Sequence, residues 1–234
     1  MSNENNPKVH VPKFGDRHAW RDAAAVVSDE DGNVEIMGNP VMESWQRPYM
    51  KELASIATSN GGVVLELGFG LGIASSFIQA APNVTEHIIV EANADIFLQT
   101  LQFARTAQRR TIPIFGFWEE VTTLLRDESI DGILYDTYPI AQGYLHSHQF
   151  MFAEHAHRIL KPGGVMTYCN LSSWGRLKAD YPDDRELFGQ TQAPRLKALG
   201  FTEVDMKVFS VSPVVDPRFN KYAYPTIPAP IIRK

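Results

Sequence analysis

The stretch GVVLELGFGLG, residues 62–72, joins a short apolar run to three glycines in alternate positions. The run GVVLEL is typical of a buried strand, and the glycines allow the backbone to turn sharply and approach a ligand closely. A dinucleotide-binding loop of the form G-x-G-x-x-G would need a glycine at position 73, where this chain has Ile73. The stretch therefore predicts a ligand-binding loop between a strand and a helix, and it argues against a nicotinamide dehydrogenase.

Further apolar runs follow this loop, with room for a helix between each pair. They are HIIVEA (87–92), TIPIFG (111–116), DGILYD (131–136), GVMTYCN (164–170) and a strand pattern at 202–211. Helical patterns lie near residues 72–80, 94–105, 119–126, 146–160 and 184–199. Strands joined by helical crossovers predict a mostly parallel α/β sheet with helices on both faces. The Pro-rich tail at 222–232 is expected to add at most an edge strand or a packed extended segment.

The chain before residue 62 has weaker patterns. Residues 1–18 are polar and are expected to lack fixed structure until something covers them. Residues 41–58 place apolar side chains at three- and four-residue spacing, which predicts a helix that starts or kinks near Pro48.

Composition narrows the function classes. The net charge of -5 and the pI near 5.8 leave no basic footprint for nucleic acid. No apolar run approaches the roughly 18–20 residues that span a bilayer, and the N-terminus lacks the apolar stretch of a secretory signal. The single cysteine, Cys169, fits a reducing compartment and is expected to be a packed, inert thiol. We therefore expect a cytoplasmic protein with neither nucleic acid nor membrane as a partner.

An acid two residues before the first glycine, Glu66, gives the loop the form E-x-G-x-G-x-G. This form resembles the loop of class I methyltransferases that binds S-adenosylmethionine (SAM). Glu91 closes the second predicted strand, where its carboxylate can accept both ribose hydroxyls, although a plain surface carboxylate at a strand end fits the pattern too. Phe117 and Trp118 follow the third strand, where they either bracket adenine or pack in the core.

Asp136 ends the fourth predicted strand, at the edge where open α/β sheets bind ligands. A guanidinium is protonated at neutral pH, because its pKa is about 12.5–13.8. Methylation of such a group requires a partner that accepts its proton, or holds its charge, while one nitrogen is freed. Asp136 is the candidate for both tasks, and a strand-end cap is the structural alternative. A non-catalytic SAM-binding module would lack this acid.

Five segments together resemble guanidinoacetate N-methyltransferase. They are VMESWQRPYM (41–50), LELGFG (65–70), GILYDTYP (132–139), HSHQF (146–150) and LKPGGVMTYCNLSSWG (160–175). The similarity extends from Trp20 to about Tyr224. It implies a Rossmann-like class I methyltransferase with a mostly parallel seven-stranded sheet, helices on both faces and an N-terminal segment that folds over the active site. We accordingly divide the chain into a lid segment, 1–40, and a single methyltransferase domain, 41–234.

The resemblance also implies a set of site residues. Those expected to bind SAM, or its product S-adenosylhomocysteine (SAH), are Trp20, Met42, Met50, Glu66, Gly68, Phe69, Gly70, Leu71, Gly72, Ile73, Ala74, Glu91, Ala92, Asn93, Trp118, Glu119 and Asp136. Those expected to bind the substrate are Met42, Gln46, Asp136, Leu171 and Ser172, with Asp136 as the catalytic residue. The backbone N–H groups of Leu171 and Ser172 match a pair that holds the substrate carboxylate. No metal is expected, although histidines cluster at 146–157, because methyl transfer from SAM needs none.

Gln46 departs from the family, which has a second guanidinium-binding acid at this position. An amide can accept a hydrogen bond but cannot balance a charge. The four-residue spacing of Met42, Gln46 and Met50 predicts one helix face, so Gln46 is still expected to point into the pocket. The expected function is SAM-dependent N-methylation of a small guanidino acid similar to guanidinoacetate, by a monomer or homodimer. The alternatives are N-methylation of L-arginine or a related guanidino metabolite of secondary metabolism, and a protein arginine methyltransferase.

Overall fold

The computed structural model describes residues 16–28, 32–140, 147–169, 177–212 and 224–234. Its centre is a sheet of seven strands in the order β6-β5-β4-β7-β8-β10-β9. The strands are β4 (Gly62–Leu67), β5 (Val84–Glu91), β6 (Arg110–Phe115), β7 (Ile130–Tyr135), β8 (Leu160–Tyr168), β9 (Glu203–Ser210) and β10 (Thr226–Arg233). The first five run parallel, and β10 is antiparallel to both of its neighbours. The predicted sheet is thus confirmed.

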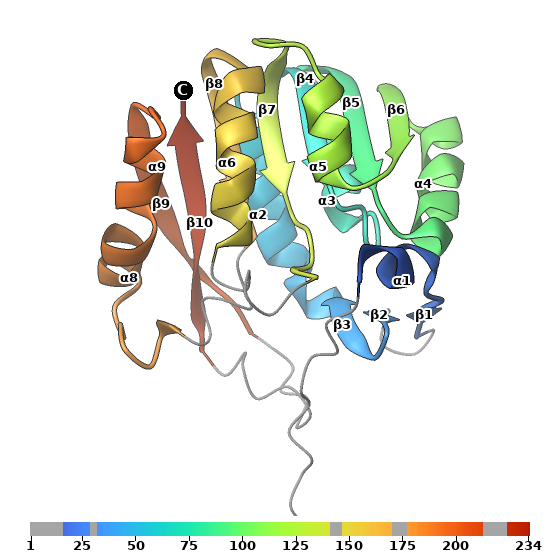
Figure 1. The fold of residues 1–234 in the computed structure, drawn as a ribbon, viewed down its shortest axis with the longest axis horizontal. Coiled ribbons are helices and arrows are strands. Elements are labelled where there is room, and N and C mark those ends of the chain that lie inside the picture. Colours follow the sequence, from blue (N-terminus) through green and yellow to red (C-terminus); the bar gives the residue numbers. More distant parts are fainter. Residues whose placement is uncertain (1–15, 29–31, 141–146, 170–176, 213–223) are drawn as a thin grey trace, which may run out of the picture.

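Helices cover both faces of this sheet (Figure 1). They are α2 (Arg47–Ala57), α3 (Ile73–Ala80), α4 (Ala94–Thr106), α5 (Trp118–Val121), α6 (His148–Ile159), α8 (Asp184–Thr191) and α9 (Ala193–Ala198). In Figure 1, α5 and α6 lie in front of the sheet, and α2 and α3 lie behind it. No described helix is both long and apolar enough to cross a membrane.

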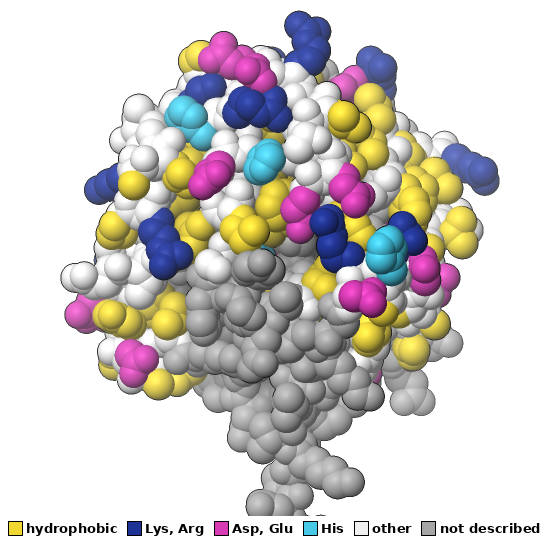
Figure 2. Space-filling model, in the orientation of Figure 1, with side chains coloured by type: hydrophobic (Ala, Val, Ile, Leu, Met, Phe, Trp, Pro, Cys, Tyr) yellow, Lys and Arg dark blue, Asp and Glu magenta, His cyan; other side chains and the backbone are white. Residues whose placement is uncertain are grey.

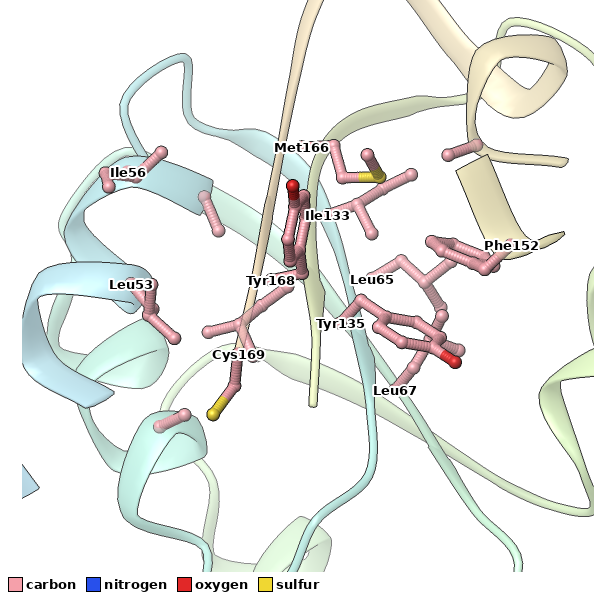
Figure 3. Close-up of a cluster of buried hydrophobic side chains, with 14 of the residues drawn as sticks. Leu53, Ile56, Leu65, Leu67, Ile133, Tyr135, Phe152, Met166, Tyr168 and Cys169 are labelled. Carbon is pink, nitrogen blue, oxygen red and sulfur yellow. The ribbon is translucent and has the colours of Figure 1, made fainter. Parts of the chain in front are cut away.

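The core lies on both faces of the central strands. Figure 3 shows Tyr135 of β7 beside Phe152 of α6, where the two rings stack with centroids 4.7 Å apart. Leu53 and Ile56 of α2 belong to the same buried cluster. These contacts fix α2 and α6 against the strands whose ends carry the site.

The N-terminal part of the chain has more structure than its sequence predicts. Helix α1 (Arg17–Asp22) begins inside the stretch expected to lack fixed structure, and Asp16 caps it by accepting a hydrogen bond from Ala19 N at 2.7 Å. Three short strands, β1 (Ala25–Val27), β2 (Val34–Ile36) and β3 (Asn39–Met42), then form a small antiparallel sheet. In Figure 1 this unit lies below the lower ends of β4 and β5.

The helix expected within residues 41–58 starts near Pro48, which was one of the two outcomes predicted, so the residues before Arg47 are not part of it. Met42 pairs with Val34 at the end of β3, and residues Ser44–Gln46 form a 3₁₀ turn, η1. Helix α2 starts only at Arg47, with Pro48 in its first turn, where the missing N–H costs nothing. The prediction that Met42, Gln46 and Met50 share one helix face was therefore wrong.

The Pro-rich tail is a further correction, because β10 is an interior strand. Its prolines, Pro228 and Pro230, lie along the pairing with β9, while β8 pairs with β10 only at Ile232 and Arg233. Both prolines therefore lie outside the part of β10 that pairs with β8, where a missing N–H would remove a hydrogen bond of the ladder. Strand β8 likewise begins earlier than predicted, at Leu160, directly after α6 ends at Ile159.

Candidate functional site

Hydrogen bonds beyond the strand ends bring four loops to one edge of the sheet. Asp136 N donates to Leu67 O at 2.9 Å, and Cys169 N donates to Tyr135 O at 2.9 Å. On the other side, Gly68 N donates to Val90 O at 2.9 Å and Gly116 N donates to Glu91 O at 3.0 Å. Residues that follow different strands in the sequence thus become neighbours in space.

The glycine loop takes a backbone shape that other residues rarely adopt. Gly68, Gly70 and Gly72 have φ values of +89°, +54° and +66°. A Cβ at Gly68 would lie 2.1 Å from the carbonyl oxygen of Asp136, and one at Gly72 would lie 2.7 Å from the Phe69 ring. Any side chain would therefore push the loop away from Asp136. The loop keeps its backbone beside the cavity because it carries no side chains at these points.

A cavity of about 530 Å³ opens at this edge, between the glycine loop and the N-terminal unit. The predicted residues on its wall are Trp20, Met42, Gln46, Gly68, Gly70, Glu91, Ala92, Trp118, Glu119 and Asp136. The predicted residues Met50, Glu66, Phe69, Leu71, Gly72, Ile73, Ala74 and Asn93 do not line it. Leu171 and Ser172 lie outside the described residues.

Glu91 is buried at the end of β5 with both oxygens already engaged. Its Oε2 accepts a hydrogen bond from Phe69 N at 2.9 Å and its Oε1 accepts one from Asn93 N at 2.7 Å. Burial raises the pKa of the Glu91 carboxyl, and these backbone N–H groups oppose the rise. Glu91 also lines the cavity, where its carboxylate is an acceptor at the end of β5.

Asp136 follows β7 and is partly open to the cavity. Burial raises the pKa of Asp136 to about 7, a hydrogen bond from the Cys169 thiol lowers it, and the nearby Glu66 carboxylate raises it further. The acid therefore titrates near neutrality, where a general base is most effective. Cys169 lines the cavity and contacts Asp136, so the expectation of an inert, packed thiol missed its place in the site.

Aromatic side chains form the wall beyond Glu91. Trp118 meets the rings of Tyr135 and Phe152 edge-on, with centroids 6.1 and 5.5 Å away. The Tyr135 hydroxyl lies 3.1 Å from Nδ1 of His148, which also faces the cavity. His148 belongs to HSHQF, one of the five segments that carry the family resemblance.

The N-terminal unit closes one side of the cavity through several contacts. The ring of Trp20 stacks on Tyr138 with centroids 5.1 Å apart. Asn93 Nδ2 donates to Trp20 O at 2.9 Å and to Ala23 O at 2.8 Å, so this predicted cofactor residue faces the unit instead. Arg17 donates to Glu119 Oε2 at 3.1 Å and lies over the Phe117 ring. Arg17 and Tyr138 line the cavity and were not predicted.

This edge of the sheet fits SAM. Gly68 and Gly70 bring the loop backbone to the cavity wall, and Glu91 offers acceptors at the end of the adjacent strand. Trp118 and Phe117 add apolar surface of the kind that packs against adenine. Among the described residues, no group of three or more His, Cys, Asp or Glu side chains could hold a metal ion.

Comparison with known families identifies the chain. The model of the family described as guanidinoacetate N-methyltransferase matches residues 13–234, nearly the whole length. The chain belongs to this family. The family is SAM-dependent, which agrees with the glycine loop and the predicted cofactor.

Curated relatives named as methyltransferases match the chain at low identity. The chain is 26% identical over 178 residues to protein arginine N-methyltransferase 2 of Yarrowia lipolytica, covering 72% of this chain and 36% of that protein. The enzyme of the same name from Saccharomyces cerevisiae is 30% identical over 149 residues, with 56% of this chain and 32% of that protein covered. The chain thus spans about a third of the curated relatives that it matches.

Solved structures support the fold. Spermidine synthase from Thermotoga maritima aligns with a TM-score of 0.59 and 15% identity, covering 90% of this chain and 71% of that one. M. jannaschii TYW2 in complex with AdoMet aligns with a TM-score of 0.54 and 16% identity, covering 90% and 87%. At these identities the likeness concerns the Rossmann-like architecture alone.

Proposed function

We propose that the protein methylates a nitrogen of the guanidino group of a small guanidino acid. The observation that carries this proposal is Asp136, a carboxyl that titrates near neutrality on the wall of the same cavity as the glycine loop. Gln46 is on this wall too, with 4% of its surface exposed. A planar cation that enters between them would meet one acid and one neutral acceptor.

Asp136 has two tasks in this mechanism. As a carboxylate it holds the guanidinium and orients one nitrogen, and it then accepts a proton from that nitrogen as the new bond forms. When bound, SAM supplies an electrophilic methyl group on a sulfonium. The guanidinium enters with one positive charge and the methylated product leaves with one, so the released proton goes to Asp136 and then to solvent. The thiol of Cys169 stabilises the carboxylate form that begins this cycle.

The N-terminal segment, residues 1–40, is proposed to act as a lid on the domain formed by 41–234. The stacking of Trp20 on Tyr138 and the bonds from Asn93 to the backbone of α1 support this division. A lid would exclude water from the site during methyl transfer. Strand β3 joins the two parts across residue 40.

The preferred substrate is a guanidinoacetate-like acid, whose carboxylate would reach the backbone N–H groups of Leu171 and Ser172. A second candidate is L-arginine, free or within a protein. Gln46 favours this candidate, because it lacks the charge of the family acid, and so does the name of the curated relatives.

One experiment separates these substrates. The protein is incubated with SAM and, separately, with guanidinoacetate, L-arginine and an arginine-containing peptide, and the products are weighed by mass spectrometry. We expect a mass gain of one methylene on a guanidino compound, with tandem fragmentation locating the methylated nitrogen. Asp136→Asn serves as the negative control. Turnover of SAM with no gain on any guanidino compound would overturn the proposal.

A further inference from the structure

Helix α1 is attached to the rest of the molecule at both of its ends, and the two attachments differ. At the carboxyl end, Asn93 Nδ2 donates to Trp20 O at 2.9 Å and to Ala23 O at 2.8 Å. Asn93 is fully buried and also caps α4, because its Oδ1 accepts a hydrogen bond from Ile96 N at 3.2 Å. Water therefore does not compete for these bonds, and this end of α1 is firmly held.

The amino end of α1 is held by the side chain of its first residue, Arg17. Its Nη2 donates to Glu119 Oε2 at 3.1 Å and lies 3.8 Å from Glu120 Oε1. Its guanidinium carbon lies 4.3 Å from the centroid of the Phe117 ring. The side chains of Arg17 and Glu119 are 42% and 37% exposed, and basic and acidic side chains lie next to one another between α5 and α1 in Figure 2.

The contact of Arg17 is part of the cavity wall. Arg17, Phe117 and Glu119 all line the cavity. Gly116 N donates to Glu91 O at 3.0 Å, so the start of α5 lies beside the end of β5. The contact is thus at the end of the cavity where adenine and ribose of the cofactor are expected.

The strength of this contact suits an attachment that opens and closes. An exposed ion pair and an exposed contact between a cation and a ring each shift an equilibrium by roughly twofold to fivefold. Local opening begins where contacts are few and exposed to solvent. The amino end of α1, held by Arg17, should therefore open before the end that is held by Asn93.

We infer that Arg17 is a positioning residue that latches α1 onto the cofactor end of the cavity, so that its contact with Phe117 and Glu119 sets the rate at which the cofactor leaves. We call these three residues the latch. The inference rests on the lid proposed above. It concerns the cofactor alone, so its test requires no guanidino compound.

The test measures how fast tritiated SAM leaves the full-length protein after an excess of unlabelled SAM is added. Arg17→Gln should raise the dissociation rate by roughly threefold to tenfold at low salt, because both contacts of the latch are lost. Salt screens exposed charges, so the wild-type rate should rise between about 0.05 and about 0.5 M salt, and Arg17→Gln should respond less. Arg17→Lys keeps the charge without the planar fork and should have an intermediate rate.

Arg21→Gln is the matched control, because it removes the same charge from the same helix. Arg21 pairs with its neighbour Asp22 at 3.0 Å and does not line the cavity. Its rate and salt response should equal those of the wild type. Glu119→Gln removes the charge that Arg17 meets and keeps an acceptor for the cofactor. Arg17→Gln should therefore have a smaller effect in the Glu119→Gln background, and fully additive effects would contradict the latch.

Trp20→Ala separates the latch from the lid, because it removes the stacking on Tyr138 and leaves Arg17 in place. Faster release from Trp20→Ala, with a wild-type rate for Arg17→Gln, would refute the latch and retain the lid. Wild-type rates in both variants would refute the latch and the lid together. A purely structural role for Arg17 predicts faster release with an unchanged salt response, and this result would also overturn the inference.

Discussion

Two walls of the cavity are built in different ways. The wall proposed to bind the cofactor, called the cofactor wall, is formed by Gly68, Gly70 and Glu91; it comes from adjacent parallel strands and is held together by hydrogen bonds that involve the backbone. The wall proposed to bind the substrate, called the substrate wall, is formed by Gln46 and Asp136 and joins a 3₁₀ turn to a strand end far along the chain. The first wall is a property of the sheet itself, whereas the second depends on how the N-terminal segments pack on it. Changes to the cofactor wall should therefore alter the binding of SAM, and changes to the substrate wall should alter substrate binding and the chemical step.

The largest loss of activity is expected from Asp136→Asn, a change on the substrate wall. This change keeps the shape and removes both the charge and the basicity. General-base steps contribute about 10²–10⁴-fold, so kcat should fall by that order while the affinity for SAM changes little. Stopped-flow or steady-state assays with the accepted guanidino compound, together with calorimetry, measure both quantities. A variant with wild-type kcat would remove Asp136 from the chemical step.

Deletion of residues 1–25 should affect both walls of the cavity. It removes Arg17 and Trp20, and with them the contacts to Glu119 and Tyr138. Misplaced groups cost about 10²-fold, so we expect kcat/KM to fall by that order and the KM for SAM to rise. Circular dichroism should show that the sheet is retained. The smaller change Trp20→Ala is the matched variant, and full activity in both would refute the lid.

Glu91→Ala tests the cofactor wall. Two charge-assisted hydrogen bonds to ribose would be lost, each contributing about 1.5–3 kcal/mol, which together correspond to a loss in SAM affinity of at least roughly a hundredfold. Because Phe69 N and Asn93 N also lose their acceptor, the loop should become less ordered. Calorimetry with SAM and SAH should report similar losses for both, since both carry the ribose. Unchanged affinity would contradict the assignment.

Asp136 should also give the enzyme a pH dependence. With a pKa of about 7, the carboxylate fraction falls as the pH drops, so kcat/KM should decrease about tenfold per unit below that pH. The free energy of unfolding should change in the opposite direction and fall as the pH rises. A folded pKa above the unfolded value of about 3.9 favours folding at low pH, and this contribution is lost as the pH rises through 7.

Asp136→Asn should therefore unfold at a higher temperature than the wild type at pH 8, with a smaller difference at pH 5. Thermal melts of both proteins at the two pH values measure this. An equal difference at both values would show that the acid is not held at a raised pKa.

The same comparison explains what the sequence could predict. The loop, the mostly parallel sheet and the places of Glu91 and Asp136 follow from short-range patterns, because parallel strands bring their ends to one edge. Met42 and Gln46 line the cavity, as the family resemblance implied, but the helix face from which Gln46 was expected to point into the pocket does not exist, since β3 and η1 replace it. The contacts between Trp20 and Tyr138 and between Cys169 and Asp136 join distant segments, and no local pattern encodes them.

The smallest expected effect, and the sharpest test of the substrate wall, comes from Gln46→Glu. The new carboxylate would lie on the same cavity wall as Asp136 and restore the second acid of the family. If guanidinoacetate is the natural substrate, its KM should fall by roughly tenfold or more, because a charged contact contributes about 1.5–3 kcal/mol. If L-arginine is the substrate, the amide meets a different group, so the change should impair arginine turnover and help guanidinoacetate little. Equal kcat/KM values for both proteins on both compounds would show that position 46 does not contact the substrate.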